Sequence, residues 1–258
     1  MDYTEFLSVL SRWLHVAAGV LWIGILYWFN FVGIPFTATM DGDTKKKVIP
    51  ELAPRALYFF RWAAVYTWVT GVLLSGFVYY MGGQMFEQGV TWSAGSYVML
   101  AVTFLMFPVY DAVAKSLGKD IRVFGAVGLV IVALVTYLMV DFAHFSYRAY
   151  VIHVGMMFGT LMAANVWMRI WPSQKKIITA TKEGTAPDAA LVALAGQRSR
   201  HNTYMSVPLL WTMINMHTSL AASGLFGLPN WVNLLVVMIL GWLLVSWMYD
   251  KSSKVKGF

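Results

Sequence analysis

The chain has 258 residues, of which 59% are hydrophobic and only 12% are charged. A soluble domain carries about 25% charged residues, so this chain cannot cover a globular surface with polar groups and is expected to lie largely in lipid. It contains no cysteine, which excludes disulfides, iron–sulfur clusters, thiolate zinc sites and covalently attached haem. The net charge is +7, but the basic residues are distributed as in a membrane protein rather than as in a protein that binds nucleic acid.

Seven apolar stretches divide the chain, each close to the ~20 residues that a helix needs to cross a bilayer. Lipid offers the backbone no hydrogen-bond partners and no strand-like alternation occurs, so we expect an all-α, polytopic helical bundle that forms a single transmembrane domain over residues 1–258. The first stretch is too long for a signal peptide and is kept as a span. The expected spans are Phe6–Phe36, Leu57–Met81, Trp92–Val113, Val123–Val140, Ala149–Trp171, Asn202–Ser223 and Trp231–Tyr249.

Basic residues orient the expected bundle. Seventeen of the 19 Lys and Arg residues lie on alternate connections or the C-terminal tail, which predicts an outer N-terminus and a cytoplasmic C-terminus in a bacterial inner membrane. Residues 172–200 are expected to form a cytoplasmic loop with a short amphipathic helix near Asp188–Gln197, because Pro187 and Asp188 resemble a helix start. Aromatic residues near the span ends, such as Tyr80 and Trp92, are expected to form an interfacial belt.

Histidines are the main functional signal, because ionisable side chains are costly inside a membrane and usually have a role there. His15, His153 and His217 fall in the first, fifth and sixth spans. At ~1.5 Å per residue, all three lie roughly 8–14 Å below the outer surface. His144, a candidate for contact with a substrate, is expected in the adjacent outer loop, whereas His201 lies on the cytoplasmic side.

Imidazoles on separate helices can hold haem b without any cysteine. Ala18 and Gly19 leave one face of the first span open next to His15. Gly155 and Gly159 begin a ridge of small residues in the fifth span. These features predict haem b, with its iron bound by two of His15, His153 and His217.

Arg12 and Arg148 are the only basic residues expected on the outer side. Each stands near a predicted ligand, where a haem propionate or an anionic substrate would need a cation. Two alternatives stay open at this point. The histidines and glycines could serve only to join helices, or three imidazoles could hold copper or zinc directly.

The sixth span is unusually polar, and we expect it to be central and to line a cavity. Asn165 of the fifth span is expected to face the same interior and is a candidate for contact with a substrate. Arg200, His201 and Asn202 lie at its cytoplasmic mouth and are candidates for binding an anion, although interfacial charges also end spans in this way. Asp111 is expected to mark the cytoplasmic end of the third span.

Three segments together resemble one known family. They are Arg12–Gly24, which reads RWLHVAAGVLWIG, His153–Trp167, which reads HVGMMFGTLMAANVW, and Arg200–Pro208, which reads RHNTYMSVP and runs on to Asn215-Met-His217. They resemble the N-terminal membrane domain of the membrane-bound bacterial urate oxidase (urate hydroxylase) family, over nearly the whole chain. The matching motif positions are His15, His153, Asn165, Arg200, His201, Asn202 and His217.

The resemblance implies an enzyme that oxidises urate and passes electrons to cytochrome c. Family members typically continue into an outward cytochrome c domain, whereas this sequence ends at Phe258. We therefore expect a haem-b-containing membrane oxidoreductase or electron-transfer subunit that delivers electrons to a periplasmic cytochrome c or a partner oxidase. The alternative from another class is a cofactor-free transporter or an assembly subunit of a respiratory complex.

Overall fold

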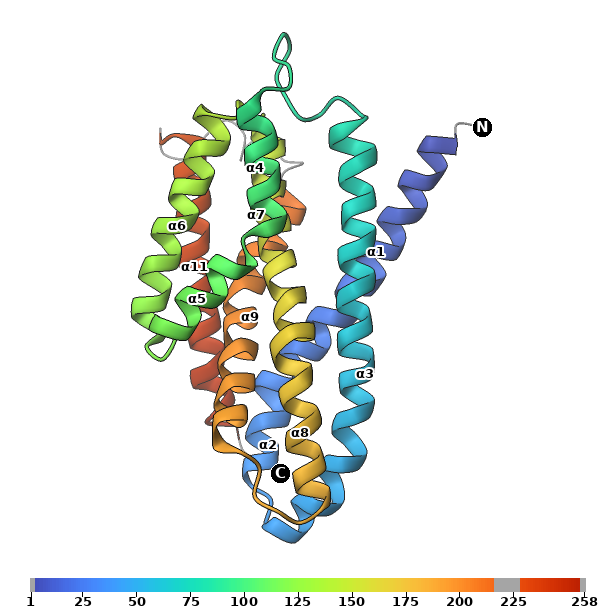
Figure 1. Ribbon diagram of the computed structural model, residues 1–258, viewed down its shortest axis with the longest axis vertical. Coiled ribbons are helices and arrows are strands. Elements are labelled where there is room, and N and C mark those ends of the chain that lie inside the picture. The colour runs from blue at the N-terminus through green and yellow to red at the C-terminus, as the bar shows by residue number, and fades with distance from the viewer. Residues whose placement is uncertain (1–2, 216–227, 256–258) are drawn as a thin grey trace. The chain divides into compact units, whose positions relative to one another are not determined.

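The computed structural model describes residues 3–215 and 228–255 (Figure 1). Within these residues the chain forms helices and no strands, which confirms the predicted all-α class. Three short π-helical turns, labelled η, interrupt the longer helices. The elements are α1 (Tyr3–Tyr27), η1 (Trp28–Gly33), α2 (Ile34–Ala38), α3 (Gly42–Ser75), η2 (Gly76–Tyr80), α4 (Ala94–Leu105), α5 (Phe107–Leu117), α6 (Ile121–Asp141), α7 (Tyr147–Asn165), η3 (Val166–Ile170), α8 (Trp171–Lys182), α9 (Ala189–Asn215) and α11 (Asn230–Ser252).

Several of these helices are long and apolar enough to cross a membrane, so the chain is a multi-pass membrane protein. The described residues contain five such segments, or six if the bent pair α4 and α5 counts as one span. The predicted number of seven spans stays a prediction, because part of the expected span Asn202–Ser223 lies outside the described residues. The predicted orientation in the membrane also stays a prediction. The five are Tyr3–Ala38, Gly42–Tyr80, Ile121–Asp141, Tyr147–Lys182 and Asn230–Ser252.

Some helices extend well beyond the length of a membrane span. The segment Gly42–Tyr80 has 39 residues, about 58 Å at 1.5 Å per residue, whereas the hydrocarbon core is ~30 Å thick. Its first part carries the basic residues that the sequence places in a loop. Exposed ion pairs one turn apart support the helix there, between Lys46 and Asp43 at 3.8 Å and between Arg55 and Glu51 at 2.8 Å.

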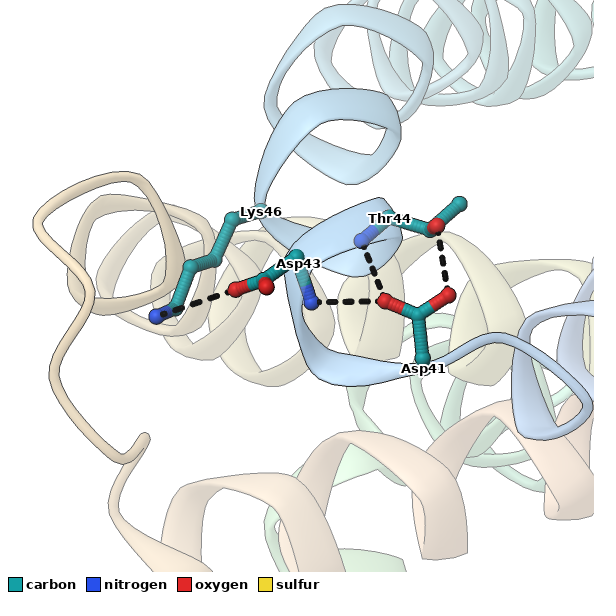
Figure 2. Close-up of polar contacts among 4 residues, drawn as sticks. All are labelled: Asp41, Asp43, Thr44 and Lys46. Carbon is teal, nitrogen blue, oxygen red and sulfur yellow. Dashed lines mark hydrogen bonds and ion pairs between the residues drawn. The ribbon is translucent and has the colours of Figure 1, made fainter.

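Asp41 caps the start of α3 (Figure 2). Its carboxylate accepts the backbone N–H groups of Asp43 and Thr44, both at 2.9 Å, and the Thr44 hydroxyl at 2.7 Å. These bonds satisfy donors that every helix leaves open in its first turn. The hydroxyl bond from Thr44 is the main reason that the pKa of the Asp41 carboxyl lies below its ordinary value.

Helix α9 begins in the same way and is longer than the sequence indicates. Asp188 accepts the backbone N–H of Ala190 at 2.8 Å, and the helix then continues past Gln197 to Asn215. Helix α8 likewise extends the preceding span to Lys182. The region 172–200, expected as a loop with one short helix, is therefore mostly helical, and the non-helical connection covers only a few residues between Lys182 and Ala189.

The third predicted span is broken rather than continuous. Helices α4 and α5 meet at an angle of 51° around Met106 (Figure 1). Pro108 explains the break, because proline has no N–H to donate and its ring collides with the carbonyl of the residue four positions earlier. The break also changes the place of Asp111, which is buried within α5 and paired with Lys115 at 2.8 Å. Helix α5 continues beyond Asp111 to Leu117, so Asp111 does not end it.

The chain divides into two compact units, each made of segments that are distant in the sequence. Met1–Ser11, Gly71–Leu161 and Met205–Trp242 form the first unit, which contains His144 and His153. The second unit contains His15 and His201, and its segments are Arg12–Thr70, Met162–Tyr204 and Leu243–Phe258. The single transmembrane domain expected from the sequence stays a prediction.

Helix α7 begins the most buried of the candidate spans. In Tyr147–Lys182, 72% of the apolar window is buried, against 22–28% in the other four. Gly155 accounts for one close contact inside the first unit, because a Cβ atom built on it would lie 2.1 Å from Thr212 Oγ1 of α9. The absent side chain therefore lets α9 approach α7. At Gly155 the small-residue ridge serves helix packing, which was one of the two interpretations left open by the sequence.

We predict that Gly155→Ala lowers the free energy of unfolding by about 1–3 kcal/mol, the usual cost of overpacking a tight contact. Gly159→Ala is the matched control on the same ridge, since its Cβ would meet Leu209 Cδ1 at an ordinary 3.6 Å. The control should be neutral or gain up to ~1 kcal/mol from helix propensity. Unfolding in mixed micelles measures both, and equal effects of the two variants would contradict the packing assignment.

The Asp41 cap should depend on pH. A carboxyl with a lowered pKa stabilises the helix start above its ordinary pKa of 3.8, and this contribution is lost as the pH falls through the lower folded-state value. Thr44→Ala removes the largest cause and should return the Asp41 pKa toward 3.8. Carbon-13 NMR of labelled aspartate measures the titration, and an unchanged midpoint in Thr44→Ala would be inconsistent with the bonding in Figure 2.

Candidate functional site

His15 lies half-buried on α1 with its ring fixed by α3. Its Nδ1 lies 2.9 Å from the backbone carbonyl of Thr67 and 3.2 Å from Thr70 Oγ1. A carbonyl oxygen can only accept a hydrogen bond, so the proton is on Nδ1 and the lone pair is on Nε2. Metal-bound histidines commonly have this arrangement, in which a backbone carbonyl fixes the tautomer and orients the ring. His15 is therefore prepared to act as a ligand through Nε2.

The same face of α1 offers room and one buried donor. Gly19 follows His15 by one turn, and a Cβ on it would lie 3.7 Å from Thr67 Cγ2. Trp22 follows by two turns and is only 2% exposed. Its buried indole N–H has no hydrogen-bond partner among the described residues. Such a donor needs an acceptor, so this face of α1 has both room and an unused donor for a bound group.

His153 is fully buried in the first unit and is held at both ring nitrogens. Its Nδ1–H donates to the carbonyl of Ala149 at 2.7 Å, so Nε2 accepts the hydroxyl of Tyr80 at 3.1 Å. The rings of Phe145, Tyr80 and Tyr79 lie 5.1, 5.8 and 6.0 Å from the imidazole. The tautomer suits a ligand, but in this arrangement the Nε2 lone pair is engaged by Tyr80.

The connection between η2 and α4 is fastened to the start of α7. Ser146 donates its backbone N–H to the Met85 carbonyl at 3.0 Å and its hydroxyl to the Gln84 carbonyl at 3.0 Å. Arg148 donates to Gln84 Oε1 at 3.1 Å. His144, a predicted substrate candidate, is exposed and has φ +54°, an uncommon backbone conformation for a residue other than glycine.

Several polar residues of α9 are buried, among them Asn202, Thr203, Ser206 and Thr212. Asn202 accepts the side-chain amide of Asn165 at 2.8 Å and donates to the Met162 carbonyl at 3.0 Å. The fold thus joins two predicted substrate candidates to each other. His201 is buried as well, whereas Arg200 is exposed, with its guanidinium carbon 5.2 Å from the centre of the Tyr249 ring.

The structure describes only some of the remaining predicted residues. Arg12 is exposed on α1, one turn before His15. His217 lies outside the described residues, so the predicted choice of two ligands among three histidines stays a prediction. Within residues 3–215 and 228–255, no three His, Asp or Glu side chains lie close enough together to hold a metal ion. The copper or zinc site would also require His217, and it likewise stays a prediction.

Sequence reasoning missed the partners of the histidines. The sequence favours an interfacial position for Tyr80, and nothing in it distinguishes Thr67 and Thr70 from other members of an apolar span. Asn30 was also missed, although a lone amide in the first span was a signal. It donates to Ser199 Oγ and accepts the Tyr249 hydroxyl, both at 2.9 Å.

We predict that Asn202→Ala lowers the free energy of unfolding by about 1–3 kcal/mol, because it removes the partner of the buried Asn165 amide and of the Met162 carbonyl. Ser253→Ala, whose hydroxyl bond to Asp250 is exposed, is the control and should change little. Thermal unfolding in detergent measures both. A neutral Asn202→Ala would indicate that the pair does not stabilise the fold and would favour a role in binding.

One comparison with known proteins identifies the family. A family model described as urate oxidase N-terminal matches residues 39–257. The matched range contains His144, His153, His201 and His217 and begins after α1, which carries His15. No curated protein and no solved structure matches the chain. Because the family model covers most of a chain whose motifs already resembled it, this helical membrane protein belongs to the urate oxidase N-terminal family.

Proposed function

We propose that the chain is the membrane part of a urate-oxidising electron-transfer system in the bacterial inner membrane. The observation that carries the proposal is the family match over residues 39–257, found on a chain with at least five apolar helices. A membrane location suits an enzyme that transfers electrons to a separate acceptor protein. The acceptor would be a periplasmic cytochrome c or a partner oxidase.

Within this system we propose that the chain binds haem b, with His15 as one axial ligand. The support is the contact of its Nδ1 with Thr67 and Thr70, which leaves the Nε2 lone pair available. The sequence offers His153 and His217 for the second ligand. Since the His153 Nε2 accepts the Tyr80 hydroxyl, ligation by His153 would require Tyr80 to move. Haem b would supply a one-electron redox centre, so urate would be oxidised in two steps.

The chain's own side chains have distinct tasks in this proposal. Thr67 and Thr70 hold the His15 ring in one tautomer, and Arg12 supplies a cation one turn away on α1. Arg200 is exposed on α9 and is the candidate for contact with an anionic substrate. Asn165 and Asn202 bond to each other, which supports a structural role for this pair.

The proposal predicts two results for the purified protein and its membranes. Protein from haem-replete cells should show the Soret band of low-spin haem, and urate added to membranes should reduce added cytochrome c. His15→Ala should lose the haem or convert it to high spin, because Nε2 is the proposed iron ligand. Absorption spectroscopy and the rate of cytochrome c reduction measure these outcomes.

His144→Asn is the matched control, since His144 is exposed and asparagine tolerates its positive φ. It should keep the spectrum of the unmodified protein. A protein without any Soret band would exclude the haem proposal. If urate also failed to reduce cytochrome c, the transporter or assembly-subunit alternative would be favoured.

A further inference from the structure

The first turn of α7, residues 147–150, carries two tyrosines on one side of the helix whose hydroxyl groups are buried. Tyr150 is only 4% exposed, and its hydroxyl has no hydrogen-bond partner among the described residues. The hydroxyl of Tyr147 is also buried and is likewise without a partner there. Their rings meet edge to face, with centroids 5.6 Å apart. Two such hydroxyls on one turn are unusual, because nearly all buried polar groups in proteins are bonded.

The same turn also carries one guanidinium group. Arg148 lies between the two tyrosines in the sequence, and one of its guanidinium nitrogens donates to Gln84 Oε1. The bonds from Ser146 to Gln84 and Met85 hold the neighbouring segment against the same turn. A phenol hydroxyl and a guanidinium both donate hydrogen bonds, and a guanidinium also carries a fixed positive charge. The turn therefore suits a group that accepts hydrogen bonds and carries negative charge.

We propose that the first turn of α7 binds an anionic oxygen of a ligand through the hydroxyls of Tyr147 and Tyr150, with Arg148 supplying the charge. Carboxylate oxygens and the carbonyl oxygens of a lactam whose N–H is deprotonated share this chemistry. The identity of the ligand rests on the proposed function, which offers two sources, the urate anion and a haem propionate. The two tyrosines would then be binding residues, and the energetic cost of two unbonded hydroxyls would disappear when the ligand is bound.

Removing only the hydroxyl oxygens tests this inference. Tyr147→Phe and Tyr150→Phe keep both rings, and Tyr97→Phe is the matched control, because Tyr97 is 60% exposed and stacks on Trp92. Three quantities are measured on the purified protein: the Tm without urate, the Kd for urate by calorimetry, and the haem midpoint potential. The control should change none of them.

If the ligand is urate, each phenylalanine variant should weaken urate binding at least tenfold without lowering the Tm or shifting the potential. If the ligand is a propionate, the potential should shift while the urate Kd holds. Variants that bind urate like the unmodified protein and keep its haem midpoint potential would overturn the inference, whatever their Tm.

Failure of the proposed function gives a different result. In that case the unmodified protein binds neither urate nor haem. The Tm then decides the inference by itself, because removal of an unbonded buried hydroxyl should raise the Tm, whereas removal of a hydroxyl that bonds within the protein should lower it. A rise supports the inference, because it shows that the hydroxyls have no partner within the protein, whereas an unchanged or lower Tm overturns it.

Discussion

In hydrocarbon, a polar side chain must find its hydrogen-bond partner inside the protein, and in this chain the partner is often a helix carbonyl. The Nδ1–H groups of His15 and His153 both donate to such carbonyls, and so do the hydroxyls of threonines along the spans, each toward the residue four positions earlier. This constraint does more than stabilise the fold. It fixes the tautomer of both histidines and thereby leaves the lone pair of each on Nε2.

The features that the sequence predicts well are those that follow from composition and local chemistry. Long apolar stretches indicated helices and a membrane, and Pro187 with Asp188 marked the start of α9. Helix ends were harder to place, because α3 and α8 continue through charged residues that hydropathy assigns to loops. The break at Met106 has its cause in Pro108, whereas the apolar stretch Trp92–Val113 by itself predicts one continuous span.

In the candidate site, the sequence likewise predicts some residues, whereas others are revealed only by the structure. The sequence points to His15 and His153, since an imidazole within an apolar span stands out. It could not reveal that Tyr80 contacts His153 or that Thr67 and Thr70 contact His15, because these partners are 52 to 73 positions away and depend on how the helices pack. The same holds for Gly155, whose role becomes clear only once Thr212 is placed against it.

The π-helical turns have a consequence for comparing relatives of this chain. A π-turn contains one residue more than the α-helical turn it replaces, so the side chains beyond it are rotated by roughly 100° about the helix axis relative to an unbroken helix. Tyr80 lies within one such turn and Asn30 within another. A relative that lacks the extra residue would align with this chain through a single gap. All of its hydrophobic positions could stay apolar, although its side chains beyond the gap would be rotated about the helix axis. A relative without the turn could therefore match this chain letter for letter on both sides of it and still present a different face to its neighbours.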